Sequence, residues 1–154
     1  MLNDLFEVLA DPDFQAPGSG LMTFPAYVYV YPPDREYEFR RALTNLRERL
    51  TRPKVQVQPS VCNIYEALLD FLRDKTLGGR SLLDRIMEVE AEKPDMIDRQ
   101  LKQHARSDPF AEYTAGRFDR FVHEEDSALD RPYVFLHGWG AIHPYLRASQ
   151  FLDR

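Results

Sequence analysis

The sequence predicts an α/β fold, in which helices flank a small parallel sheet of about three strands and a helical insertion separates the second strand from the third. Short segments rich in aromatic and β-branched residues predict the strands, at residues 26–31, 54–58 and 133–137. Longer segments with apolar residues at steps of three and four predict amphipathic helices between them. Such alternation of strands and helices is typical of α/β proteins with a parallel sheet.

The composition is that of a globular domain. Of the 154 residues, 44% are hydrophobic and 29% charged, so we expect a single domain over residues 1–154 with its own core. Acidic residues outnumber basic residues by 25 to 20, and the net charge of −5 argues against direct nucleic-acid binding as the main activity. The single cysteine, Cys62, excludes an internal disulfide and indicates a reducing compartment.

The start of the chain and its hydropathy predict a cytoplasmic protein. Residues 1–14 lack the basic stretch and the apolar core that make up a signal peptide. No apolar run in the sequence approaches the roughly 20 residues that are needed to span a bilayer. We therefore expect neither secretion nor membrane insertion.

The first third of the chain predicts a helix, a strand and a second helix. Residues 2–10 have helical spacing, and the strand at residues 26–31 is apolar on both faces, which indicates burial beneath helices. Asp34 is the predicted cap of a helix that ends at Leu50. Arginines and glutamates alternate along this helix, so we expect them to pair with each other rather than to form a nucleic-acid surface.

The alternating residues 54–58 predict the second strand. Strand, helix and strand over residues 26–58 form a predicted βαβ unit with a right-handed crossover, as in a Rossmann-like sheet. Ser60 is the predicted cap of the next helix, at residues 61–72, and Gly78-Gly79 is its predicted stop. Further helices are predicted at residues 81–92, where Ser81 is the cap, at 94–105 and at 108–130.

The third strand and the loop after it are the segment most informative for function. The strand ends at His137, and Gly138 and Gly140 follow it in a sharp loop. In open parallel sheets, ligands bind beyond the carboxyl ends of the strands. Glycines at such a place permit a tight turn or the close approach of a ligand. A helix predicted at residues 142–152 would present its first amides to an anion.

Two interpretations of this loop stay open. In the first, the glycines only turn the chain and Trp139 packs against the core. In the second, residues 138–140 form the floor of a pocket for a small ligand or a hydrolytic reaction, and Arg147 supports an acidic group. The candidate binding residues are His137, Gly138, Gly140, His143 and Arg147.

The sequence lacks the common catalytic motifs. An α/β-hydrolase needs a Gly-x-Ser-x-Gly elbow, and none occurs. Residues 77–81 follow a helix and have arginine where a phosphate loop has lysine, and there is no Gly-x-Gly-x-x-Gly. No two of the four histidines stand three or four residues apart on one helix. We therefore predict no catalytic residue, no metal site and no cofactor, and a non-enzymatic role is favoured.

Four stretches of the sequence carry a resemblance to a known family. They are residues 6–14, 25–32, 57–72 and the series Phe135, Leu136, Gly138, Gly140, Pro144 and Arg147. In these stretches the chain resembles the BrxB family of bacteriophage-exclusion (BREX) defence systems, and the resemblance covers essentially the whole chain. It departs at residues 148–150, where the family tends to carry histidine. The family also continues past Arg154 with another strand, so we expect a truncation relative to the family.

The resemblance implies a non-enzymatic accessory or adaptor protein of an anti-phage complex, acting through protein–protein contacts. Its implied partners are BREX components, above all a PglZ-like protein of the alkaline-phosphatase superfamily. Docking would use helical faces and residues 138–147. A missing strand would leave an exposed sheet edge, so self-association through that edge is also expected.

Overall fold

A computed structural model describes residues 2–14, 27–55, 57–90, 92–124 and 131–153. The chain divides into two compact units. The first consists of Met1–Ser60 and Glu125–Tyr133, and the second of Val61–Glu124 and Val134–Arg154. No helix in the described part of the chain is both long enough and apolar enough to cross a membrane.

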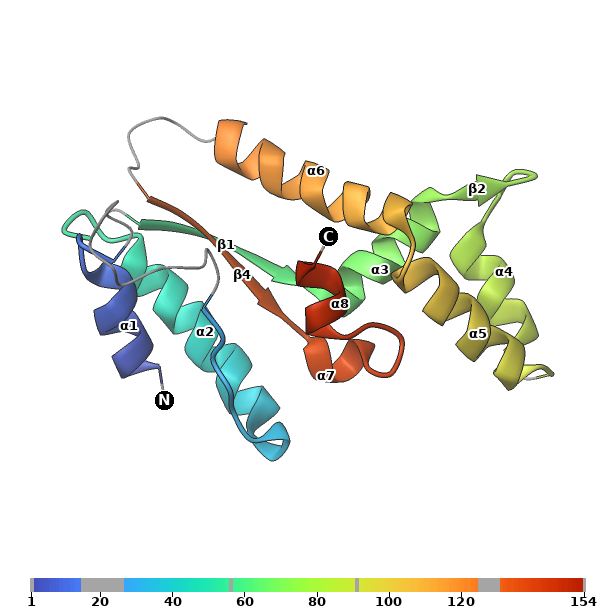
Figure 1. Cartoon of the computed structure of the whole chain (residues 1–154), viewed down its shortest axis with the longest axis horizontal. Coiled ribbons are helices and arrows are strands. Elements are labelled where there is room, and N and C mark those ends of the chain that lie inside the picture. The colour runs from blue at the N-terminus through green and yellow to red at the C-terminus, as the bar shows by residue number, and fades with distance from the viewer. Residues whose placement is uncertain (1, 15–26, 56, 91, 125–130, 154) are drawn as a thin grey trace. The chain divides into compact units, whose positions relative to one another are not determined.

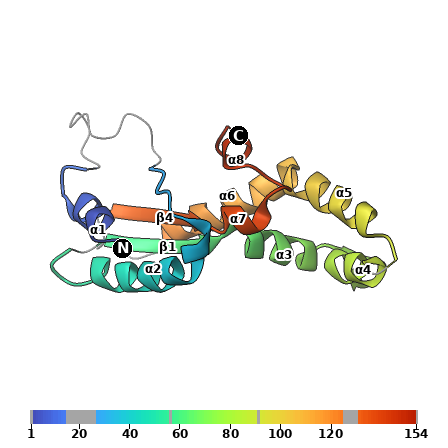
Figure 2. The same ribbon diagram turned by 90° about the horizontal axis from the view of Figure 1, so that it is seen from below.

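A two-stranded parallel sheet connects the two halves of the sequence. Strand β1 (Val57–Asn63) pairs with β4 (Arg131–His137), and the strands lie side by side in Figures 1 and 2. Each strand begins in the first unit and ends in the second. The predicted mixture of helices with a small parallel sheet is confirmed, and the described residues between β1 and β4 are mainly helical. Within the described residues this sheet has two strands, where the sequence predicts about three.

Two α-helices pack together in the first unit. α1 (Asn3–Ala10) packs against α2 (Glu36–Leu50), which follows a 3-10 turn, η1 (Pro33–Arg35). Both helices are confirmed. The N-cap of α2 is Arg35 and not the predicted Asp34, because Asp34 lies inside η1. The apolar residues that stand at helical spacing along α2 are all buried: Phe39, Leu43, Leu46 and Leu50.

Charged side chains along α2 pair locally, as the sequence predicts. Arg35 contacts Glu38 at 2.6 Å, and Arg40 contacts Glu36 at 2.8 Å. Each pair joins residues three or four positions apart, which lie on the same face of a helix. These arginines are therefore engaged with neighbouring carboxylates.

The predicted first strand is wrong. Residues 27–32 have no regular secondary structure, and residue 26 lies outside the described part of the chain. Val28 and Val30, predicted to be buried, are 73% and 84% exposed. The βαβ unit predicted over residues 26–58, with its right-handed crossover, is therefore not formed.

The tyrosines of this segment pack on a helix instead. The rings of Tyr29 and Tyr31 stack on Phe39 of α2, with centroids 6.2 Å and 3.9 Å from the Phe39 ring. The propensity of aromatic residues for strands reflects a fit to a half-buried surface, and a helix face supplies such a surface too. The composition of the segment therefore indicates partial burial correctly, although it does not indicate what covers the rings.

β1 begins and ends later than predicted. Residues 51–55 form a turn after α2, so the strand begins at Val57, and residue 56 lies outside the described residues. It continues through Ser60 and Val61, which the sequence assigned to a helix cap and to the helix itself. The apolar residues that end the strand lead directly into those of the helix, so their spacing does not mark the boundary.

The second unit has a helical core. α3 (Ile64–Asp74) packs against α4 (Leu82–Val89) and α6 (Asp108–Glu124), and α4 packs against α5 (Pro94–Ala105). α5 has the predicted bounds, while residues 125–130 of the predicted last helix of the insertion lie outside the described part. In Figure 1, α3 continues directly from the end of β1. The most deeply buried side chains of this core are Ile64, Leu68, Leu72, Phe110 and Ile142.

A hairpin stands where the sequence predicts only a helix stop. α3 ends at Asp74, and β2 (Thr76–Leu77) pairs antiparallel with β3 (Arg80–Ser81). Gly78 and Gly79 form the turn with φ of +62° and +78°, since two-residue hairpin turns of this kind need positive φ at both positions. The Ser81 hydroxyl then accepts from the Asp84 amide at 3.0 Å, which confirms the predicted cap of α4.

Candidate functional site

The carboxyl ends of β1 and β4 come together in the second unit. β1 ends at Asn63, and Gly138 directly follows the last residue of β4. A Cβ atom placed on Gly138 would lie only 2.2 Å from the Asn63 side-chain oxygen. The strand ends therefore touch through the Asn63 amide group, at the edge of a parallel sheet where ligands are expected.

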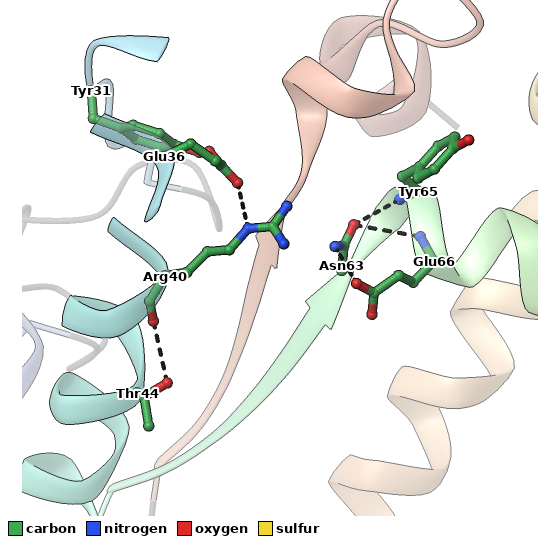
Figure 3. Close-up of polar contacts among 7 residues, drawn as sticks. All are labelled: Tyr31, Glu36, Arg40, Thr44, Asn63, Tyr65 and Glu66. Carbon is green, nitrogen blue, oxygen red and sulfur yellow. Dashed lines mark hydrogen bonds and ion pairs between the residues drawn. The ribbon is translucent and has the colours of Figure 1, made fainter. Parts of the chain in front are cut away.

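Asn63 closes β1 and caps α3 (Figure 3). Its Oδ1 accepts from the backbone amides of Tyr65 at 3.1 Å and Glu66 at 3.4 Å. Its Nδ2 donates to Glu66 Oε1 at 2.8 Å. Because the first amides of α3 already have an acceptor within the chain, this helix N-terminus is occupied by Asn63.

Gly138 turns the chain between β4 and α7 (Trp139–Ile142). It is buried and has φ of +84°, a left-handed conformation that L-residues with side chains rarely adopt. The room that its missing side chain leaves is filled by the Asn63 amide. This observation supports the interpretation of Gly138 as a turn residue over its interpretation as the floor of a pocket.

Gly140 has a different environment. It is an exposed residue inside α7, and a Cβ atom placed there would meet nothing within 4 Å. Trp139 beside it is half-buried against the core, and its ring contacts Phe151 with centroids 5.6 Å apart. The two glycines of the predicted loop therefore differ, since only at residue 138 does the backbone conformation require glycine.

The helix predicted at residues 142–152 is wrong. Two short helices, α7 and α8 (Ala148–Leu152), take its place with residues 143–147 between them. Pro144 has no backbone N–H and disfavours a helical residue before it, and His143 accordingly has an extended backbone with φ −67° and ψ 137°. No helix begins at residue 142, so the predicted anion site does not form, and Arg147 precedes α8 instead of lying within a helix.

The candidate side chains lie at different depths. His137 is half-buried at the end of β4, whereas His143 and Arg147 are exposed in the segment between α7 and α8. The Arg147 backbone amide donates to the Gln150 side chain at 3.3 Å, which helps to start α8. His143 and Arg147 are therefore available to a partner at the surface.

Arg106 at the end of α5 holds this segment. Its Nε donates to the carbonyl oxygen of Tyr145 at 2.8 Å, and its terminal nitrogen donates to that of Pro144 at 3.3 Å. Arg106 itself is exposed. The backbone between His143 and Arg147 is thus fixed from a neighbouring helix.

Cys62, the residue before Asn63, has the environment of an inert thiol. It is buried in β1 rather than early in a helix as predicted. Burial raises the pKa of the thiol, and the positive charge of Arg117 opposes that shift only in part. Among the described residues, no group of three or more His, Cys, Asp or Glu side chains is arranged to hold a metal ion.

Two residues of this region escaped the sequence analysis. Asn63 had a local signal, because Asn63 and Glu66 have the three-residue spacing of a capping box. Arg106 had no such signal, since it contacts residues almost forty positions further along the chain.

Comparisons with protein-family models, curated proteins and solved structures find no match to this chain.

Proposed function

We propose that this protein is a non-enzymatic adaptor of a BREX-type anti-phage complex, which binds a PglZ-like protein of the alkaline-phosphatase superfamily. The proposal rests on the sequence resemblance to the BrxB family. Its best-defined part is the series from Phe135 to Arg147, which spans the end of β4, the short helix α7 and the exposed segment before α8.

One observation carries the protein-binding role. The polar residues of this series that are free to meet a partner, His143 and Arg147, stand on the surface, while the space beside Gly138 is filled by Asn63. A ligand pocket would need that space, whereas a docking surface needs exposed side chains on a fixed backbone. Arg106 fixes the backbone here through the carbonyls of residues 144 and 145.

Exposed apolar side chains elsewhere are a second line of support. Large apolar side chains that face solvent often mark protein–protein contacts. In the second unit, Leu77 is 61% exposed and Met87 is 59% exposed. Methionine adapts well to partner surfaces because its side chain is flexible and polarizable.

Size-exclusion chromatography with light scattering tests the proposal. The protein is run alone, a PglZ-type protein of a BREX system is run alone, and the two are then mixed. We expect a new peak whose mass is that of a complex. A mixture that elutes as two separate components would contradict the proposed partner. The run of the protein alone also measures whether it self-associates.

A further inference from the structure

A basic surface is built around the segment between α7 and α8, and we define it by Arg106, His143 and Arg147. Arg106 binds the carbonyls of Pro144 and Tyr145 and is itself exposed. His143 and Arg147 flank those two residues in the chain and are exposed as well. His143 and Arg147 therefore emerge from one short stretch of backbone, and Arg106 reaches that stretch from the end of α5.

The charge of this surface is opposite to that of the whole protein. The net charge of the chain is −5, yet Asp153 is the one acidic residue in residues 131–154. Asp98 and Glu90 are the carboxylates that act on the neighbouring Tyr145 side chain, and Asp98 is held by Lys102 at 2.6 Å. Within the described part of the chain, Arg147 and His143 form no ion pair, in contrast to Arg35, Arg40, Arg73, Arg80 and Arg117.

Two aromatic residues belong to the same part of the chain. Trp139 and Tyr145 are half-buried at the edge of the core of the second unit, and the ring of Trp139 leans on Phe151 of α8. Tryptophan, tyrosine and arginine are the residue types that most often dominate the energetics of protein interfaces. A surface that is fixed before binding also loses little conformational entropy when it meets a partner.

We propose that the basic surface of Arg106, His143 and Arg147 binds an acidic segment of a partner protein. This inference rests on the proposed adaptor function and adds the chemistry of the partner. The complementary charge would speed association and favour partners rich in aspartate and glutamate over neutral or basic ones. A nucleic acid presents negative charge too, but a protein of net charge −5 repels a long phosphate backbone outside the immediate contact.

Titration calorimetry with a graded charge series at Arg147 tests the inference. The PglZ-type protein and a labelled poly-glutamate peptide are each titrated with the wild type, Arg147→Gln and Arg147→Glu. The matched controls are Arg120→Gln and Arg120→Glu, since Arg120 is exposed on α6 in the same unit and carries the same charge. Circular dichroism establishes that each variant is folded.

We expect the affinity for both ligands to fall in the order wild type, Gln and Glu, with a loss of roughly tenfold for Arg147→Glu and no change for the Arg120 variants. Added salt should weaken the binding of the wild type more than that of Arg147→Glu, because the variant already lacks the charge attraction that salt screens. The Arg147→Gln variant keeps the test meaningful if the charge reversal disturbs α8.

The outcomes separate the two proposals. If the PglZ-type protein binds all variants equally, the acidic-segment inference is wrong and the adaptor function stands. If the PglZ-type protein does not bind the wild type, the proposed partner is wrong, and the peptide titration alone decides the inference. Peptide binding that is absent, or that weakens equally in the Arg120 variants, would overturn it. Arg147-dependent binding of duplex DNA in place of the peptide would overturn it as well.

Discussion

Two aromatic-rich segments of this chain have a similar character and different structures. Residues 27–31 read Tyr-Val-Tyr-Val-Tyr, and residues 133–137 read Tyr-Val-Phe-Leu-His. The second lies in β4 and pairs with β1, while the first has no regular secondary structure and exposes both valines. A strand forms where a segment pairs with a neighbouring strand and its side chains fit a half-buried surface. Local composition therefore does not decide which of the two segments forms a strand.

The residues that come after the two segments also differ. Gly138, at the end of β4, turns the chain with positive φ and lets the end of β1 approach. Residues 27–31 lead into Pro32 and Pro33, and the latter begins a 3-10 turn before α2. The contrast suggests experiments that substitute residues in the sheet or beside it and use residues elsewhere in the chain as controls.

The largest effect is expected at the end of β4. Gly138→Ala forces a side chain into a left-handed backbone and against the Asn63 amide, and we expect a loss of about 3 kcal/mol or more in the free energy of unfolding. Gly140→Ala, the control, has space and lies in a helix, where alanine is favoured by about 0.5–1 kcal/mol. Urea unfolding monitored by circular dichroism measures both. Equal effects for the two variants would contradict the described turn.

A matched pair of valines tests the sheet itself. Val57 at the start of β1 is completely buried, so Val57→Ala removes packing and is expected to cost about 2 kcal/mol. Val30 in the other segment is 84% exposed, so Val30→Ala is expected to change the free energy of unfolding by less than about 0.5 kcal/mol. Thermal and urea unfolding give the two differences. A cost for Val30→Ala as large as that for Val57→Ala would mean that residues 27–31 are buried in solution.

The smallest effect concerns the anchor of residues 27–31. The Tyr31 hydroxyl donates to Glu36, which also binds Arg40 (Figure 3). Burial and the Glu36 contact raise the pKa of Tyr31 to about 12. Because the folded state favours the neutral hydroxyl, this contribution to stability is present below about pH 10 and is lost as the pH rises toward 12.

Tyr31→Phe removes both the hydrogen bond and this alkaline dependence. At neutral pH we expect a loss of about 0.5–1 kcal/mol, since the ring can still stack on Phe39. The free energy of unfolding of the wild type should fall more steeply at alkaline pH than that of the variant. Parallel pH curves for the two proteins would show that Tyr31 does not anchor the segment.

Local sequence signals predicted the helices up to residue 124 well, whereas the single helix predicted at residues 142–152 is wrong. α5 has the predicted bounds because Pro94 is suited to a first turn and the apolar spacing continues to Ala105. The cap at Ser81 and the ion pairs along α2 were likewise predictable, because each involves residues only three or four positions apart. At the candidate site, the same local reasoning identified Gly138 as a turn and His143 and Arg147 as residues of interest.

By itself, the sequence determined the helical segments up to residue 124, the strand at β4 and the need for a sharp turn at residue 138, since periodicity and turn chemistry act over a few residues. The tertiary structure decided which aromatic segment joins the sheet, why Gly138 matters and Gly140 does not, and which arginine holds residues 144 and 145. Each of these depends on a partner distant in sequence: β1 for β4, Asn63 for Gly138, and the Tyr145 carbonyl for Arg106. Contacts of that kind form only when the chain has folded, so local patterns do not encode them.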